Sequence, residues 1–395
     1  MRLVTGTAAV AESLRRSLAG DGVTAPLPPP GPEREQTLAM LRPDRPVTEP
    51  GAAAIVATSG STGHPRGVVL PRVALIASAE ATHRRLGGPG TWVLALPTHY
   101  VAGLMVLVRA AVAGRPVREV DSRLDGLRGI DLGADPVFLS LVPTQLTRAL
   151  DDPDLTRALT GFQAVLLGGA AADPMLLERA RAAGIPVVTT YGMSETCGGC
   201  VYDGVPLDGV EVATDADGRL VLGGPTVFAG YRLDPVATAE ALRDGRLVTR
   251  DRGTITDGRV AVLGRVDDVI VSGGVNVDLA AVERAVRGWA GGEAAVVGVP
   301  SAEWGTEVVA VVEDGRFLPG VLGAPPAPGG TSYTRGIFRL SALRAALARA
   351  LPSYALPRRL VVRPELPRTS GGKIDRRQLI TDLAGLPVGR PEDPT

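Results

Sequence analysis

Residues 51–67 read GAAAIVATSGSTGHPRG, an apolar run followed by a cluster of Thr, Ser and Gly. The run at 51–57 predicts a buried strand, and the cluster predicts a loop directly after it. Glycines allow sharp bends that bring backbone N–H groups up to an anion, and hydroxyls add donors with little bulk. Arg66 adds positive charge. The composition favours a phosphate-binding loop over a Ser/Gly linker, because linkers rarely follow a buried strand directly; the Walker pattern is absent.

Downstream of this loop, segments typical of strands and helices alternate. Apolar runs predict buried strands at 91–97, 137–142, 164–167 and 187–190. Helical patterns are found at 71–85, 143–150 and 174–182. Strands that alternate with helices predict an α/β fold with a largely parallel sheet. Upstream, residues 20–50 are rich in proline and charge, and they read as a loop or linker.

The pattern changes after about residue 205. Short strands with turns, in DADGRLVLGG and TDGRVAVLGR, predict a small antiparallel β unit. After Arg265 the pattern predicts an α+β domain with strands at 267–274, 294–299, 306–312 and 359–362 and helices at 278–287 and 341–351. Residues 313–336 read as a Gly/Pro-rich loop of doubtful order, and the tail after about 384 as loose. We therefore expect a large α/β domain over 1–265 and a small mobile α+β domain over 266–395.

Composition limits the classes of function. The 395 residues are 45% hydrophobic and 21% charged, which is ordinary for a soluble protein of two or three domains. Acidic and basic residues balance at 42 each, so no nucleic-acid or membrane-surface partner is indicated. We expect no membrane span and no signal peptide. Two cysteines do not make a disulfide framework, and they favour a reducing, cytoplasmic location.

Two further features bear on chemistry. Lys373 is the only lysine of the chain. Where arginine serves every other basic position, a surviving lysine indicates a place that needs a compact ammonium.

The segment YGMSET at 191–196 offers an aromatic ring for a base, a hydroxyl for a phosphate and a carboxylate for Mg²⁺. Taken alone, this segment is equally well interpreted as a surface turn.

Five motifs occur in the order and rough spacing of the acyl-adenylate-forming superfamily: TSGSTGHPRG (58–67), YGMSET (191–196), TRD (249–251), GRVDD (264–268) and PRTSGGK (367–373). The chain therefore resembles this superfamily over about residues 50–380. Its members include acyl- and aryl-CoA ligases, luciferases and the adenylation domains of peptide synthetases. Three phrases resemble the o-succinylbenzoate–CoA ligase subgroup in its short actinobacterial form: LPTHYVAGL (96–104), SLVPTQLTRAL (140–150) and YGMSETCGGCVYDG (191–204).

The resemblance implies a nucleotide site. The family loop that closes over the β- and γ-phosphates of ATP corresponds to Thr58, Ser59, Gly60, Ser61, Thr62, Gly63 and Arg66. The family usually has lysine at the last of these positions, and we interpret the arginine as a tolerated exchange of cations. Adenine would stack on Tyr191, the α-phosphate would meet Ser194, and Mg²⁺ would be held by Glu195. The same pocket would include Gly169, Ala170 and Gly192.

The ribose hydroxyls would be bound by Asp251, with Arg265 as its companion. At the adjacent position, Arg250 replaces the family's usual glycine. The small domain would turn about Asp267, as the family makes its adenylate in one orientation and its thioester in another. In the first orientation, Lys373 would bridge the acid carboxylate and the α-phosphate.

The acid pocket is expected to include His99, Gly168, Met193 and Gly198. A lone histidine at a strand end could equally be a structural residue with satisfied hydrogen bonds. Cys197 and Cys200 form a C-x-x-C pair, which can indicate redox or metal chemistry. Two cysteines without a histidine cluster do not complete a zinc site, so small residues lining the acid pocket are the favoured interpretation.

Taken together, the resemblance implies an AMP-forming acid–thiol ligase that uses ATP, Mg²⁺ and coenzyme A, with Gly273 and Gly274 helping to form the pantetheine tunnel. The implied acid is o-succinylbenzoate, an intermediate of menaquinone biosynthesis. Three alternatives remain: a ligase for another acid, a stand-alone enzyme that loads a carrier protein, and an inactive nucleotide-binding relative. Whether the chain forms a homodimer is left open.

Overall fold

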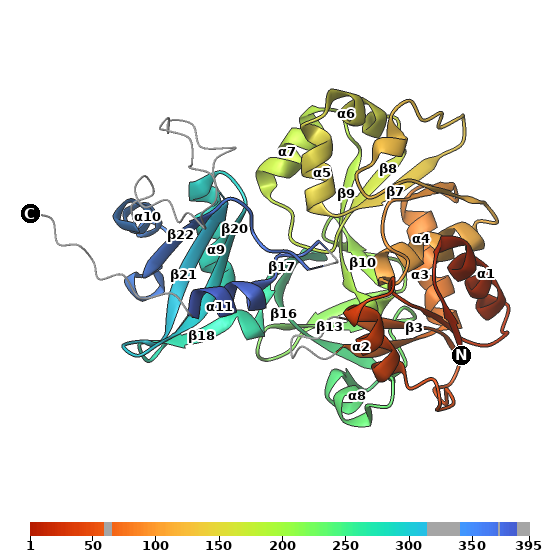
Figure 1. Cartoon of the computed structure of the whole chain (residues 1–395), viewed down its shortest axis with the longest axis horizontal. Helices are drawn as coiled ribbons and strands as arrows, with labels where there is room; N and C mark the ends of the chain where they lie inside the picture. The colour runs from red at the N-terminus through yellow and green to blue at the C-terminus, as the bar shows by residue number, and fades with distance from the viewer. Residues whose placement is uncertain (59–64, 314–339, 370–371, 385–395) are drawn as a thin grey trace, which may run out of the picture. The chain divides into compact units, whose positions relative to one another are not determined.

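The computed structural model describes residues 1–58, 65–313, 340–369 and 372–384. The chain forms two compact units, the first made of Met1–Thr249 with Gly253–Ala261 and the second of Arg250–Arg252 with Val262–Thr395. It passes between them along β16 (Arg246–Thr256) and β17 (Arg259–Arg265) (Figure 1). The expected fold class, α/β layers with a small β unit and a smaller α+β part, is confirmed. A domain boundary at 265 and a rotation about Asp267 stay predictions.

The first sheet of the large unit includes the strand that precedes the predicted phosphate loop. Its order is β1-β2-β3-β4-β14, with bounds Arg2–Val4, Thr24–Pro26, Ala52–Thr58, Arg66–Pro71 and Gly230–Tyr231. The strand expected at 51–57 is β3. The following strand β4 was not expected, because the helical pattern was read from residue 71; it pairs antiparallel with β3, and helix α3 (Arg72–Arg85) begins directly after it.

The interpretation of residues 20–50 as a loop or linker is wrong in part. They include β2 and the helix α2 (Pro32–Leu41). Proline fits the first turn of a helix, where its missing N–H is not needed. Glu33 and Glu35 stand in that same turn, where acidic side chains complement the helix dipole. The prolines and charges of this segment therefore mark the start of a helix.

The second sheet of the large unit has seven strands in the order β11-β10-β9-β8-β7-β5-β6. Their bounds, in that order, are Val205–Pro206, Gly198–Tyr202, Val187–Met193, Ala164–Leu167, Val137–Leu141, Thr91–Leu94 and Val117–Glu119. The five strands from β9 to β6 are parallel neighbours, whereas β10 and β11 are antiparallel. The expectation of a largely parallel sheet is confirmed.

Alternate residues of the central strands enter two separate cores. Trp92 and Leu94 pack with residues of α3 and of two further helices, α1 (Thr7–Leu18) and α4 (Val101–Val112). Val93 and Leu139 join the second core, which includes α5 (Pro143–Leu150), α6 (Pro153–Thr160) and α7 (Pro174–Ala182). Successive side chains of a strand point to opposite faces. A sheet covered on both faces therefore has strands that read as continuous apolar runs.

A smaller antiparallel sheet follows in the chain, as expected after residue 205. Its order is β12-β13-β16-β15, and β17 pairs with β16. The bounds not yet given are Glu211–Thr214 for β12, Arg219–Gly223 for β13 and Leu242–Arg243 for β15. Helix α8 (Pro235–Ala241) precedes β15.

The second unit is built on a hairpin and a three-stranded sheet. The hairpin pairs β18 (Val269–Ser272) with β19 (Val275–Asp278). The sheet has the order β20-β21-β22, with bounds Ala294–Ser301, Gly305–Glu313 and Arg359–Arg363. The helices are α9 (Leu279–Ala290), α10 (Leu340–Leu347) and α11 (Arg376–Ala384). Most of the segment expected as a Gly/Pro-rich loop, 314–336, and the tail from 385 lie outside the described residues.

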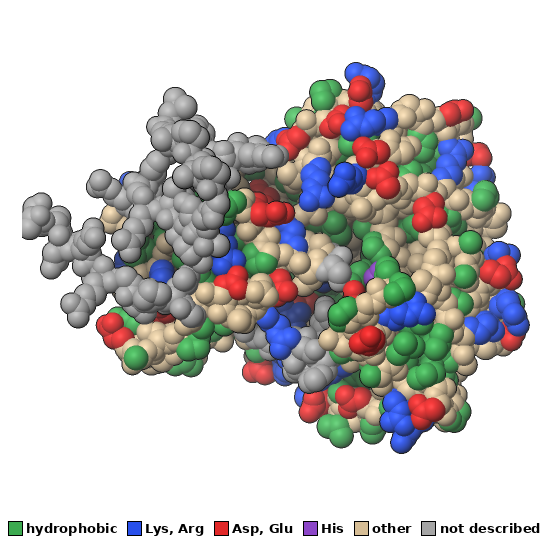
Figure 2. Space-filling view, viewed as in Figure 1, with side chains coloured by type: hydrophobic (Ala, Val, Ile, Leu, Met, Phe, Trp, Pro, Cys, Tyr) green, Lys and Arg blue, Asp and Glu red, His purple; other side chains and the backbone are tan. Residues whose placement is uncertain are grey.

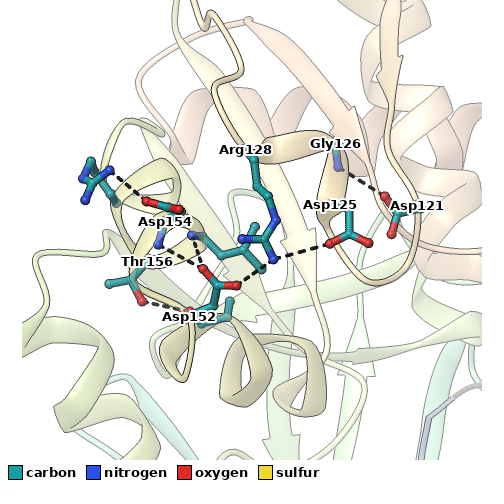
Figure 3. Close-up of polar contacts among 10 residues, drawn as sticks. Asp121, Asp125, Gly126, Arg128, Asp152, Asp154 and Thr156 are labelled. Carbon is teal, nitrogen blue, oxygen red and sulfur yellow. Dashed lines mark hydrogen bonds and ion pairs between the residues drawn. The ribbon is translucent and has the colours of Figure 1, made fainter.

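On the surface of the large unit, Arg128 joins the loop after β6 to the start of α6 (Figure 3). Its guanidinium donates to Oδ2 of Asp152 at 2.6 Å and to Oδ1 of Asp125 at 3.5 Å. Asp152 also caps α6, since its Oδ1 accepts from the N–H groups of Asp154 and Leu155. One aspartate therefore fixes both a helix end and a neighbouring loop.

The described surface carries charges of both signs. Figure 2 shows acidic and basic side chains interspersed over the visible face of the described residues. This distribution agrees with the balance of 42 acidic and 42 basic residues. Within the described ranges, the helices are all too short or too polar to cross a membrane.

Candidate active site

Three of the predicted site segments meet at one edge of the seven-stranded sheet. Strands β5, β8 and β9 belong to its parallel part, so their carboxyl ends lie at the same edge. His99 comes shortly after β5, Gly168 directly follows β8, and Met193 ends β9. This is the edge at which open α/β sheets bind their ligands.

The segment YGMSET forms the end of β9 and a tight connection to β10. Ser194 and Glu195 stand in a short 3-10 turn, η2 (Ser194–Thr196). The turn is fixed by Thr196, whose hydroxyl lies 2.9 Å from the N–H of Met193 and donates to the carbonyl of Gly198 at 2.7 Å. Both Ser194 and Glu195 are half-buried. The hydroxyl and the carboxylate are therefore presented from a rigid hairpin rather than from a loose surface turn.

Two glycines of the site are required by close neighbours. A Cβ at Gly168 would lie 2.4 Å from Oγ1 of Thr190, on the adjacent strand. A Cβ at Gly192 would lie 2.1 Å from the carbonyl oxygen of Gly198, across the hairpin. Gly169 has a φ of +83°, a conformation that favours glycine, and Ala170 follows it as an exposed residue. Tyr191 is half-buried on β9 beside these positions.

The two ends of the predicted phosphate loop face each other. Thr58 ends β3 and Arg66 begins β4, and the two residues are paired in the antiparallel register. Oγ1 of Thr58 donates to the carbonyl of Arg66 at 3.4 Å. The positions between them that were assigned to ATP, Ser59, Gly60, Ser61, Thr62 and Gly63, lie outside the described residues.

One residue of this site was missed by sequence reasoning. Tyr231, on β14, donates its hydroxyl hydrogen to Oε1 of Glu195 at 2.8 Å. The guanidinium carbon of Arg66 lies 5.3 Å from the centroid of the same ring, within the range of a cation–π contact. Burial, together with the charge of Glu195, raises the pKa of Tyr231 above its ordinary value. The residue belongs to a two-residue strand, and no periodic pattern indicates it.

The expected acid pocket brings together two aromatic residues and an acidic one. The rings of His99 and Tyr100 lie 4.3 Å apart, centroid to centroid. The hydroxyl of Tyr100 donates to Oε1 of Glu33 at 2.6 Å. Burial lowers the pKa of His99, and the charge of Glu33 opposes that shift. Glu33 belongs to α2, and its place here was not expected from the sequence.

Cys197 and Cys200, on either side of Gly198 and Gly199 in the chain, are fully buried. Both thiols are free. Cys197 has a φ of +53°, and its carbonyl accepts a hydrogen bond from Ser78 at 3.1 Å. Among the described residues, no group of three or more His, Cys, Asp or Glu side chains could hold a metal ion. Gly198, expected in the acid pocket, is likewise buried, and a Cβ there would lie 3.5 Å from Cγ of Met105.

The donor set suits a magnesium ion carried in with a nucleotide. Mg²⁺ usually binds through one or two carboxylates together with substrate phosphates and water. Glu195 supplies one half-buried carboxylate, with one oxygen engaged by Tyr231. A site with a single protein carboxylate therefore fits Mg²⁺ bound to ATP, and it does not fit a metal held by the protein alone.

The second unit holds the remaining predicted residues. Nη1 of Arg265 lies 4.0 Å from Oδ1 of Asp251, whose side chain is 15% exposed, so the two residues predicted to bind the ribose lie close together. Asp267 stands in the short turn η3 (Val266–Asp268). Lys373 is exposed, and it is the second residue of the described range 372–384. The carbonyl of Lys373 accepts a hydrogen bond from the N–H of Thr369 at 2.7 Å.

Gly273 and Gly274 form the turn of the β18–β19 hairpin, with φ values of +57° and +80°. The N–H of Gly273 donates to the carbonyl of Trp304 at 3.0 Å. A Cβ at Gly273 would lie 2.8 Å from Cε3 of that indole, so the ring packs directly on the turn. The guanidinium of Arg358 lies over the indole, 3.4 Å from the ring centroid. The turn expected in the pantetheine tunnel therefore rests on a stacked Trp–Arg pair.

Comparison with known proteins agrees with this geometry. Residues 8–232 match the model of the AMP-binding enzyme family, and residues 290–373 match that of the AMP-binding enzyme C-terminal domain. The chain belongs to the AMP-binding enzyme family, and the predicted acyl-adenylate-forming superfamily is confirmed.

Two relatives with high identity are named as 2-succinylbenzoate–CoA ligases. The chain is 41% identical to a probable 2-succinylbenzoate–CoA ligase of Mycobacterium tuberculosis, covering 96% of this chain and 97% of the relative. It is 33% identical to the 2-succinylbenzoate–CoA ligase of Geobacillus kaustophilus, and the match covers 83% of this chain and 68% of that relative.

Solved structures show the same fold. ATP-bound MatB from Rhodopseudomonas palustris superposes with a TM-score of 0.75 at 21% identity, covering 97% of this chain and 95% of that one. The o-succinylbenzoate CoA synthetase MenE of Bacillus subtilis, in complex with its acyl-adenylate, superposes with a TM-score of 0.69 at 24% identity. The match covers 95% of this chain and 82% of that one.

Proposed function

We propose that this chain is an ATP-dependent 2-succinylbenzoate–CoA ligase, which forms o-succinylbenzoyl-CoA, AMP and pyrophosphate in menaquinone biosynthesis. The observation that carries the proposal is the 41% identity to the mycobacterial relative over almost the full length of both chains. The predicted family residues support it, since Glu195, Asp251 and Lys373 are all present.

In the first half-reaction, a carboxylate oxygen of the acid attacks the α-phosphorus of ATP. A new P–O bond forms, and the bond to the pyrophosphate oxygen breaks. Lys373 places its ammonium between the carboxylate and the α-phosphate, where negative charge develops. Arg66 binds the departing phosphates and Ser194 donates to the α-phosphate, while Tyr191 stacks on adenine. Bound Mg²⁺ would offset the charge of the phosphates from its position on Glu195.

In the second half-reaction, the sulfur of CoA attacks the acyl carbon. The C–S bond forms, the bond to the AMP oxygen breaks, and the thiol proton is released. The small domain turns about Asp267 between the two steps, which removes Lys373 and brings in the turn of Gly273 and Gly274. The ribose of the nucleotide stays on Asp251 throughout.

The acid is bound at the edge formed by His99, Gly168, Met193 and Gly198. His99 is the only one of these with a side chain able to meet a carboxylate, and its imidazole is held against Tyr100. Cys197 and Cys200 are small buried residues that flank Gly198 and Gly199 in the chain. We also infer a cytoplasmic location from the two free thiols.

The decisive experiment measures CoA thioester formation by the purified chain with ATP, Mg²⁺ and a panel of acids that includes o-succinylbenzoate. We expect a strong preference for that acid. Preference for a different acid would overturn the proposed substrate but leave the assignment as an AMP-forming ligase in place. Transfer to a phosphopantetheinylated carrier protein but not to free CoA would favour a loading enzyme. Nucleotide binding without pyrophosphate release would indicate an inactive relative, and gel filtration tests for a homodimer.

A further inference from the structure

Tyr231 stands between two groups that the proposed mechanism assigns to the phosphates. Its hydroxyl donates to Oε1 of Glu195 at 2.8 Å, and its ring lies 5.3 Å from the guanidinium carbon of Arg66. The ring is braced on another side by Phe228, 4.9 Å away centroid to centroid and roughly edge-on. A single side chain therefore contacts both the carboxylate expected to hold Mg²⁺ and the cation expected to bind the phosphates.

The backbone of Tyr231 is firmly fixed. It pairs with Val68 of β4, and its N–H donates to Oγ1 of Thr238 at 2.9 Å. The next residue, Arg232, donates its N–H to the carbonyl of Gly67 at 2.7 Å. Since Gly67 directly follows Arg66, the ring of Tyr231 and the cation rise from neighbouring strands with a fixed register.

The turn that bears Glu195 is tied to the same segment. The N–H of Phe228 donates to the carbonyl of Glu195 at 2.9 Å. The carboxylate and the phenol are thus held together by a backbone bond as well as by their side chains. A carboxylate with one oxygen engaged by a hydroxyl keeps the other oxygen for a cation, and it cannot rotate freely.

We propose that Tyr231 is a positioning residue for nucleotide-bound Mg²⁺: its hydroxyl orients Glu195 toward the ion, and its ring restrains Arg66 toward the phosphates. This inference rests on the proposed function, because it takes the roles of Glu195 and Arg66 from it. Tyr231 would act through these two side chains rather than by contact with the ion or the substrate.

The test uses Tyr231→Phe, which removes the hydroxyl and keeps the ring. We expect the Mg²⁺ concentration for half-maximal ATP–pyrophosphate exchange to rise about tenfold. Excess Mg²⁺ restores the rate, and the KM for the acid stays unchanged. Electron paramagnetic resonance of Mn²⁺ with enzyme and ATP, without any acid, should show a parallel loss of metal affinity. Tyr231→Leu also removes the ring, so it should raise the KM for ATP further.

Tyr202→Phe is the matched control. It removes another buried tyrosine hydroxyl, which lies 3.1 Å from Oγ1 of Thr82 and outside the site. We expect this variant to keep the Mg²⁺ dependence of the parent protein. The proposal is overturned if Tyr231→Phe leaves both the Mg²⁺ dependence and Mn²⁺ binding unchanged. It is also overturned if activity falls without rescue by Mg²⁺ while Mn²⁺ binding is intact. Because the Mn²⁺ measurement needs no acid, it separates this inference from an error in the proposed substrate.

Discussion

The hydroxyl of Tyr100 donates a 2.6 Å hydrogen bond to Oε1 of Glu33, across a sequence separation of 67 residues. This bond connects helix α2, in the short lead before the phosphate loop, to the residue next to His99. The lead of the chain therefore contributes a charged group to the expected acid pocket.

Glu33→Gln tests the role of that charge. Glutamine still accepts a hydrogen bond from Tyr100, but it no longer opposes the effect of burial on the pKa of His99. The pKa of His99 then falls further, so a smaller fraction of the imidazole is charged at neutral pH. We expect kcat/KM for the acid to fall about twofold to fivefold, with no change in the KM for ATP.

The pH dependence of kcat/KM for the acid tests the direction of this effect. If the charged imidazole binds a carboxylate of the acid, kcat/KM declines as pH rises through the pKa of His99. In Glu33→Gln this decline should begin at lower pH. Tyr100→Phe keeps the charge of Glu33 and should leave the midpoint of the decline in place. Identical profiles for Glu33→Gln and the parent would show that Glu33 has no such role.

Lys373→Ala separates the two half-reactions. Removing the ammonium that the proposed mechanism places at the attacked phosphate should slow ATP–pyrophosphate exchange about 100-fold to 1000-fold. Thioester formation from a synthetic acyl-adenylate should proceed nearly as in the parent, because the proposed domain rotation removes Lys373 before that step. Lys373→Arg keeps the positive charge and asks whether guanidinium can replace the compact ammonium. Equal loss in both half-reactions would contradict the assigned role.

Trp304→Ala should produce the opposite pattern. The indole packs on the turn of Gly273 and Gly274, so its removal loosens the wall of the expected pantetheine tunnel. We expect kcat/KM for CoA to fall about tenfold, measured as thioester formation. Pyrophosphate exchange by the same preparation is the internal control and should not change. A fall in both activities would indicate a general loss of the fold.

Replacing Arg232 should have a large effect on the stability of the fold. It is 3% exposed, and its guanidinium donates to the carbonyls of four residues, Leu41, Arg42, Arg45 and Pro46. Arg232→Ala leaves these acceptors without their donor, so we expect the free energy of unfolding to fall by about 3 kcal/mol. Arg232→Lys should retain only part of this stabilisation, since an ammonium cannot match the planar arrangement of donors in the guanidinium. Urea denaturation followed by circular dichroism measures both.

The buried thiols offer a test of the C-x-x-C pair. Burial raises the pKa of Cys200 to about 11 and that of Cys197 well above its ordinary value. Because the thiolate is the reactive form, neither should react with a thiol reagent such as Ellman's reagent at pH 8. Both should react at once in denaturant. Rapid reaction of one thiol in the folded protein would instead support a redox motif.

Much of the fold could be predicted, because its central strands are covered on both faces. The run at 164–167 is apolar throughout, and it coincides with β8. Proline misled the prediction at 20–50, where Pro32 starts a helix instead of marking a loop. Strand β14 has two residues, too few for any periodic signal. What local pattern alone determines was thus predictable, and what tertiary pairing determines was not.

The candidate site divides in the same way. Glu195 and Asp251 were predicted from motifs, and each is found beside a partner: Tyr231 for the first and Arg265 for the second. Arg265 was predicted as well, since its motif follows closely in the chain. Tyr231 and Glu33 were missed because they reach the site through strand pairing and helix packing. No spacing in the sequence encodes those contacts.

The exposed turn that bears Lys373 has a practical consequence. Because no other lysine occurs, the chain carries one ε-amino group, and it lies on the residue to which the proposed mechanism assigns the adenylation step. Any reagent or transferase that acylates lysine side chains has one target in this protein. Acylation there would neutralise the ammonium that the proposed first half-reaction uses. Amine-directed dyes and surface couplings that modify this side chain would therefore inhibit adenylation, whereas chemistry directed at other side chains leaves that group intact.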